Sequence, residues 1–101
     1  MSEVTSLAEV RDNIDRLDRM IVPLIAERGR YVMAAARFKS DADEVPAPAR
    51  VEAVIGKVRA LAEAHGAIPD VVEKAYRAMI AAFIEAELAE HRRLKEGDAP
   101  R

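Results

Sequence analysis

A long stripe of apolar residues, spaced in alternating steps of three and four, is the feature that most restricts this 101-residue chain. Its members are Leu7, Val10, Ile14, Leu17, Ile21, Leu24, Tyr31, Ala35 and Phe38. The spacing is typical of a helix with a coiled-coil-like seam, and Ser6 with Glu9 forms a capping-box pattern at its start. A helix over about 6–39 would be about 50 Å long, and the rest of so small a domain cannot cover both of its ends. We therefore expect a second copy to pack along it.

Pro23 lies in the middle of this pattern. A proline inside a helix removes a backbone donor and clashes one turn back, at a cost of about 3 kcal/mol. Because the stripe keeps its phase across the proline, we expect one kinked helix. Two helices meeting near Val22 are the alternative.

Two further helices are predicted after an acidic loop over residues 40–47. The second, over about 48–65, begins at Pro48 and ends at His65-Gly66, where glycine suits a left-handed cap. Its inward residues are expected to be Val51, Val54, Ile55, Val58 and Leu61. The third, over about 69–95, is expected to pack through Val72, Tyr76, Met79, Ile80, Phe83, Ile84 and Leu88. The prediction is one all-α domain over 1–101, with a frayed tail after Lys95.

Composition excludes several kinds of function. Sixteen Lys and Arg against eighteen Asp and Glu leave a net charge of −2, so there is no general attraction for nucleic acid or an anionic membrane. The absence of cysteine excludes disulfides and thiolate chemistry. The polar N-terminus and the lack of a long apolar run predict a cytoplasmic protein. His65 and His91 lack metal-ligand spacing, and His91 is expected on a solvated face, so no metal or cofactor is predicted.

Two cations lie where the first stripe predicts apolar residues. Arg28 takes the next seam position after Leu24, and Lys39 follows eleven residues later. On a continuous helix the two would lie within about 20° of one face and about 16 Å apart, so they could hold a small dianion. There are two alternatives for Arg28. It could form a salt bridge to an internal carboxylate, or its aliphatic stem could follow the apolar surface and place the guanidinium in solvent.

Arg11 flanks the same seam seventeen residues before Arg28, about 25 Å along the axis. It cannot reach the same ligand within one chain. Antiparallel pairing of two first helices would bring Arg11 of one copy toward Arg28 and Lys39 of the other and make two equivalent sites. Otherwise Arg11 is an ordinary surface residue.

Glu87 follows Phe83 by four residues and therefore lies on the inward face of the third helix. It is a candidate site residue, although it could simply pair with Arg28 or Lys39 as a structural ion pair. Arg50, one turn into the second helix, is a candidate anion contact at a helix N-terminus or a solvated residue.

These residues together resemble the all-helical (type II) chorismate mutases and, within them, the isochorismate-pyruvate lyase branch. The matching segments are Leu7-x-x-Val10-Arg11-x-x-Ile14-x-x-Leu17-Asp18, Arg28, Ala35-Ala36-Arg37-Phe38-Lys39, Val45-Pro46-Ala47-Pro48-Ala49-Arg50-Val51 and Glu87. The resemblance implies an intertwined three-helix homodimer that receives Arg11 in trans and needs no cofactor. It also implies that Arg11 and Arg28 hold the substrate carboxylates and that Arg50 lines the lid side. Lys39 and Glu87 would then lie on opposite sides of the ether oxygen.

Two positions depart from the mutase pattern. Val51 stands where mutases commonly carry an acidic residue, and Glu87 stands where glutamine is frequent; a glutamate donates a hydrogen bond only when it is protonated. The expected activity is rearrangement of chorismate to prephenate. Conversion of isochorismate to salicylate and pyruvate is the alternative, and an amino analogue of chorismate as the substrate is a third option. A non-catalytic helical dimer, in which Arg28, Lys39 and Glu87 neutralise one another, is the alternative from another class.

Overall fold

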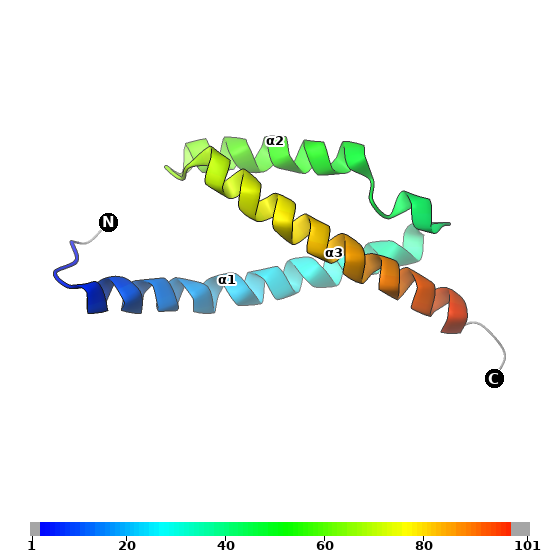
Figure 1. The fold of residues 1–101 in the computed structure, drawn as a ribbon, viewed down its shortest axis with the longest axis horizontal. Coiled ribbons are helices and arrows are strands. Elements are labelled where there is room, and N and C mark those ends of the chain that lie inside the picture. The colour runs from blue at the N-terminus through cyan, green and yellow to red at the C-terminus, as the bar shows by residue number, and fades with distance from the viewer. Residues whose placement is uncertain (1–2, 98–101) are drawn as a thin grey trace. The chain divides into compact units, whose positions relative to one another are not determined.

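The computed structural model describes residues 3–97, and within that range it contains three α-helices and no strand. The helices are α1 (Leu7–Ala35), α2 (Pro48–Ala64) and α3 (Pro69–Gly97), with the short 3₁₀ helices η1 (Ala36–Phe38) and η2 (Ala42–Glu44) before α2 (Figure 1). The all-α class is confirmed. The tail expected to fray after Lys95 is helical to Gly97, and its residues 98–101 lie outside the described residues. The chain divides into two compact units, residues 1–31 and 32–101.

The helix α1 runs without interruption through Pro23, so the alternative of two helices meeting near Val22 is wrong. Its N-terminus is capped as predicted. The Glu9 backbone N–H donates to Ser6 Oγ (3.1 Å), and Glu9 Oε2 accepts from the Thr5 backbone N–H (2.7 Å). The backbone hydrogen bond from Thr5 lowers the pKa of Glu9. Local capping therefore starts this helix where the sequence pattern indicates.

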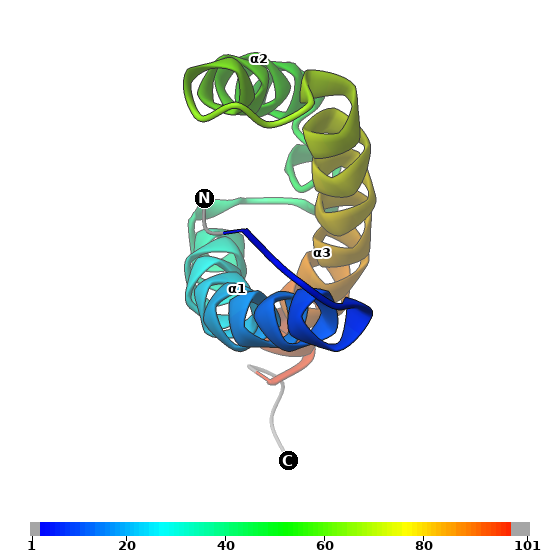
Figure 2. The same cartoon turned by 90° about the vertical axis from the view of Figure 1, so that its left-hand side faces the viewer.

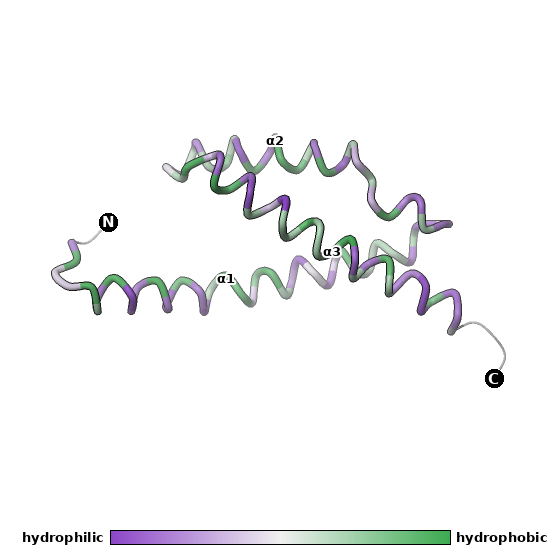
Figure 3. The backbone as a smooth tube through the Cα atoms, viewed as in Figure 1, coloured by the Kyte–Doolittle hydropathy of each residue, from purple (hydrophilic) through white to green (hydrophobic). Residues whose placement is uncertain are grey.

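The apolar stripe of α1 is largely solvent-exposed. Leu7, Ile14, Leu17, Ile21 and Leu24 are between 44% and 63% exposed, and apolar and polar residues alternate along the helix in Figure 3. One helix cannot bury its own apolar face. This stripe is therefore suited to packing against another apolar helical surface, which is the physical reason for expecting a second copy.

The first helix ends earlier than predicted. Its α-helical part ends at Ala35, η1 follows, and Lys39 has an extended backbone (φ −102°, ψ 127°). The Lys39 N–H donates to the Ala36 carbonyl (3.4 Å), three residues back. Residues 34–36 are all alanine, the best helix former, so local propensity does not stop the helix here. The prediction that Lys39 and Arg28 share one helix face assumes a continuous α-helix. It does not hold, because the chain leaves the α-helix before Lys39.

The helices α2 and α3 form a hairpin within residues 32–101 (Figure 2). The turn between them begins at the predicted glycine: Gly66 has φ 72°. The Ala67 N–H donates to the Ala62 carbonyl (2.8 Å) and the Gly66 N–H to the Glu63 carbonyl (3.4 Å). This is the Schellman pattern, which satisfies carbonyls at the end of a helix and requires a left-handed residue. Pro48 and Pro69 are the first residues of α2 and α3, as predicted.

The packing of α2 follows most of its predicted face. Ile55 and Val58 are buried, and Ala62 joins them, whereas Leu61 is 56% exposed and its predicted inward position is wrong. The reason is helical geometry: Ala62 lies within about 20° of Ile55, and Leu61 lies about 120° away. The predicted residues of α3, from Val72 to Leu88, are half-buried. The helix α3 contacts α2 and also η1 and η2.

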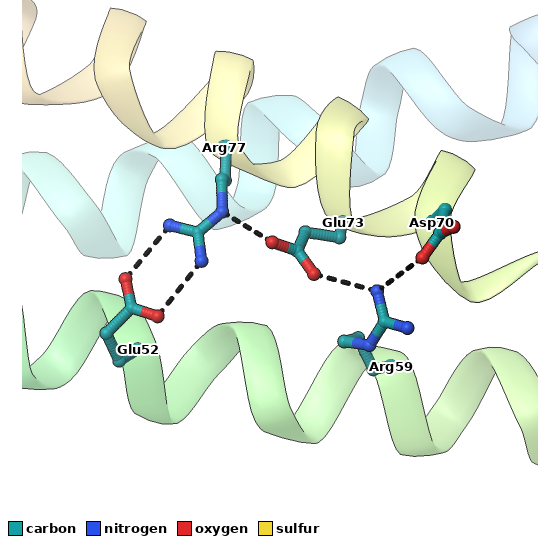
Figure 4. A network of polar contacts seen from close by, with 5 residues as sticks. All are labelled: Glu52, Arg59, Asp70, Glu73 and Arg77. Carbon is teal, nitrogen blue, oxygen red and sulfur yellow. Dashed lines mark hydrogen bonds and ion pairs between the residues drawn. The ribbon is translucent and has the colours of Figure 1, made fainter.

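A network of exposed charges also joins α2 to α3 (Figure 4). Arg77 makes a two-pronged contact with Glu52 (2.9 Å for each bond) and a bond to Glu73 (2.7 Å). Arg59 bonds to Glu73 (2.7 Å) and Asp70 (3.0 Å). Glu73 thus accepts from both arginines. Hydrogen bonds from Arg77 lower the pKa of Glu52, and those from Arg77 and Arg59 lower that of Glu73.

Replacing Arg77 with methionine is expected to lower the melting temperature by a few degrees at neutral pH. The two carboxyls have a lower pKa when folded than their ordinary value of 4.5. Their contribution is therefore complete above that pH and is lost as the pH falls through the folded pKa values. Melting curves of both proteins should converge in acid. Arg93→Met is the control, since Arg93 pairs with Glu90 inside α3 and joins no two elements. An Arg77 effect that persists at pH 2 would contradict this account.

Candidate functional site

Lys39 is held at both ends by contacts within residues 32–101. Its Nζ donates to Glu87 Oε2 (2.5 Å) and to the Val45 carbonyl (3.4 Å). Its backbone N–H donates to Ala36, and its carbonyl oxygen lies 3.0 Å from Nε2 of His91. The backbone and the ammonium group of this lysine are therefore both fixed by the protein.

Glu87 and His91 lie four residues apart on α3, and each is only 3% exposed. Residues at this spacing share one face of a helix. The predicted inward position of Glu87 is confirmed. The expectation that His91 lies on a solvated face is wrong. His91 follows Glu87 by four residues, as Glu87 follows Phe83, so the helical period indicates an inward position for His91. The charged neighbours of His91 obscured this pattern.

The ion pair between Lys39 and Glu87 is one of the two arrangements that the sequence left open for Glu87. The Glu87 side chain is 5% exposed and that of Lys39 is 21% exposed. A buried carboxylate needs a partner, since removing one member of such a pair costs about 3–5 kcal/mol. An ammonium has three N–H donors, and Glu87 and Val45 take two of them. The third donor and the partial exposure leave Lys39 able to contact a ligand as well.

A groove beside this pair carries positive charge. Its lining is Ala36, Arg37, Lys39, His91, Leu94 and Lys95. Three of these residues are cations, and none is acidic. A groove of one charge sign concentrates ligands of the opposite sign. The groove is therefore suited to an anion.

The other predicted site residues lie on different elements. Arg11 is exposed and Arg28 is half-buried, and both lie on α1 within residues 1–31. Because α1 is continuous, the two are about 25 Å apart along its axis. They cannot contact one small ligand from the same chain. Arg50 lies in the first turn of α2 and is exposed.

Two further findings concern the described residues alone. Across residues 3–97, no cluster of three or more His, Cys, Asp or Glu side chains has an arrangement that could hold a metal ion. In the same range, no helix combines the length and the apolar character needed to cross a membrane.

Comparisons with known proteins identify the family to which the chain belongs. Residues 10–88 match the family model described as chorismate mutase type II. The chain belongs to this family. A curated relative, the isochorismate pyruvate lyase of Pseudomonas aeruginosa, is 36% identical over 86 residues, which are 85% of each chain. The predicted resemblance is thus confirmed, and the chain is an enzyme of the isomerase or lyase type that this family comprises.

Proposed function

We propose that this protein is a chorismate mutase, which rearranges chorismate to prephenate without a cofactor. The observation that carries the proposal is the placement of Lys39, a partly exposed ammonium group held against a buried carboxylate at the edge of a basic groove. Such a rearrangement needs no nucleophile. It needs a compact conformer held in place and charge stabilised on the breaking carbon–oxygen bond. Groups that bind anions from several directions meet both needs.

In this proposal Lys39 donates to a carboxylate and to the ether oxygen of the substrate. Its third N–H donor makes the first of these contacts, and the second forms when the substrate displaces Glu87 from the ammonium, while Val45 keeps the side chain in place. Once the substrate has displaced its contact with Lys39, Glu87 faces the ether oxygen from the other side and donates to it when protonated. Arg28 binds a substrate carboxylate, and Arg50, at the start of α2, lines the entrance.

The proposed active form is an intertwined homodimer in the cytoplasm. The exposed apolar stripe of α1 supports pairing of two copies. The length of α1 also supports a partner, because it keeps Arg11 too far from Arg28 to serve the same ligand within one chain. Arg11 therefore enters the site of the neighbouring subunit.

The loop over residues 40–47 is proposed to close over the bound substrate and exclude water. The loop is folded on itself: Ser40 Oγ donates to Glu44 Oε1 (2.5 Å), and the Asp43 N–H donates to Asp41 Oδ1 (2.9 Å). Val45 anchors its far end, since this side chain is buried. A loop with internal hydrogen bonds can move as one piece about such an anchor.

Isochorismate pyruvate lyase activity is the second candidate. The 36% identical relative carries that name, and Val51 stands where mutases commonly carry an acidic residue. Both reactions are pericyclic and use substrates of similar shape and charge. One pocket could therefore support both.

The deciding experiment is to incubate the purified protein separately with chorismate and with isochorismate and to identify the products by chromatography. Prephenate from chorismate is the expected result. Salicylate and pyruvate from isochorismate, with little prephenate from chorismate, would replace the mutase proposal with the lyase. No turnover of either compound by folded protein would favour the non-catalytic helical dimer.

A further inference from the structure

We propose that His91 is a positioning residue, which acts by fixing the backbone of Lys39 and so the point at which the Lys39 ammonium meets its ligand. The inference rests on the proposed function for its catalytic consequence, but its geometric basis is independent. His91 is 3% exposed, and its Nε2 lies 3.0 Å from the Lys39 carbonyl oxygen.

The Lys39 carbonyl needs this contact because the chain leaves helical geometry at that residue. The backbone of Lys39 is extended, and the residues after it form an irregular loop around η2. A carbonyl outside a helix has no regular backbone partner and must find a donor elsewhere. A carbonyl oxygen only accepts, so the Nε2 of His91 carries the proton. Both the neutral tautomer with that proton and the imidazolium can donate it.

One helix holds both the ammonium group and the carbonyl of Lys39. Glu87 binds the ammonium and His91 binds the carbonyl, and the two lie one turn apart on α3. Their separation along the helix axis is about 6 Å. Since α3 is a continuous helix over this region, it fixes the two attachment points relative to each other. The position of Nζ then depends chiefly on α3, with a further contact from the Val45 carbonyl.

The contacts of Lys39 with Glu87 and with His91 respond differently when a ligand binds. A ligand carboxylate competes with Glu87 for the ammonium, whereas the carbonyl contact involves no ligand and is kept. His91 therefore holds Lys39 at the moment when the ion pair is weakened. Because a misplacement of about 1 Å can cost about 100-fold in rate, loss of this anchor should lower kcat. It should change KM less, since the arginines supply most of the ground-state attraction.

The test compares His91→Leu with His91→Gln. Leucine fills the site without a donor, and the glutamine amide nitrogen reaches nearly the position of Nε2. His91→Leu is expected to lower kcat about 10- to 100-fold and to change KM less than about threefold. His91→Gln is expected to retain kcat within about threefold. Assays are run well below the melting temperature of each variant, so that only folded protein is compared. Equal kcat values in His91→Leu and wild type, or equal losses in both variants, would overturn the inference.

A second measurement does not depend on turnover. Brief treatment with acetic anhydride, followed by mass spectrometry, measures how fast Lys39 is acetylated relative to the exposed Lys57 and Lys74. Lys39 should be acetylated several-fold faster in the leucine variant than in wild type, because the lysine side chain leaves Glu87 more often. In the glutamine variant, the acetylation rate of Lys39 should match that of wild type. Unchanged labelling in the leucine variant would overturn the inference. If the acetylation rate of Lys39 depends on a donor at position 91 but the wild-type protein turns over neither substrate, the anchor is upheld and the proposed function is rejected.

Discussion

Replacing Lys39 with methionine is expected to lower kcat/KM about a thousandfold. Lys39 is the cation that the structure places against Glu87, and in the proposed mechanism it stabilises charge on the breaking bond. Removing one preorganised donor of this kind typically costs about 100- to 1000-fold in rate. The measurement is the initial rate of prephenate formation from chorismate, or of salicylate formation if isochorismate is the substrate.

The same substitution also leaves Glu87 buried without its partner, so a matched variant is needed. Lys39→Met should lower the melting temperature, because an unpaired buried carboxylate is costly. The double variant Lys39→Met/Glu87→Leu should recover that stability, since both charges are gone, and should remain inactive. A stable double variant with near wild-type turnover would reduce this ion pair to a structural role.

The second large effect is expected from mixed dimers. Arg11→Ala and Lys39→Met should each be nearly inactive alone. Refolded together in equal amounts, they should recover about a quarter of the wild-type activity. Half of the dimers are then mixed, and each mixed dimer has one site with Arg11 from one copy and Lys39 from the other. The recovery should be more than tenfold above either variant alone.

The control places both substitutions in one chain and mixes it with wild type. If Arg11 acts in trans, the mixed dimers have no intact site, and about a quarter of the activity remains. If Arg11 acts within its own chain, each mixed dimer keeps one site, and about half remains. The two arrangements therefore give different activities in both experiments. A folded, active monomer at assay concentrations would contradict the dimer altogether.

Several parts of the fold could be predicted because they depend on local interactions. Ser6 and Glu9 cap α1 through residues three and four apart, and Gly66 takes the left-handed conformation that ends α2. Glu87 lies on the predicted inward face, since the period of a helix holds wherever the helix is unbroken. Leu61 shows the limit of this reasoning. Its apolar side chain predicts an inward position, whereas the phase of the helix selects the smaller Ala62.

Capping and periodicity act over a few residues, so the three helices, most of their termini and the inward face that carries Glu87 can be predicted from the sequence alone. The folded chain sets the end of α1, gives Lys39 its extended backbone and brings His91 to the Lys39 carbonyl. These depend on contacts of Lys39 with Glu87 and His91, residues 48 and 52 positions further along the chain. A run of alanines favours continuing the helix to Lys39, and no local pattern can reveal that α3 supplies a partner for its carbonyl.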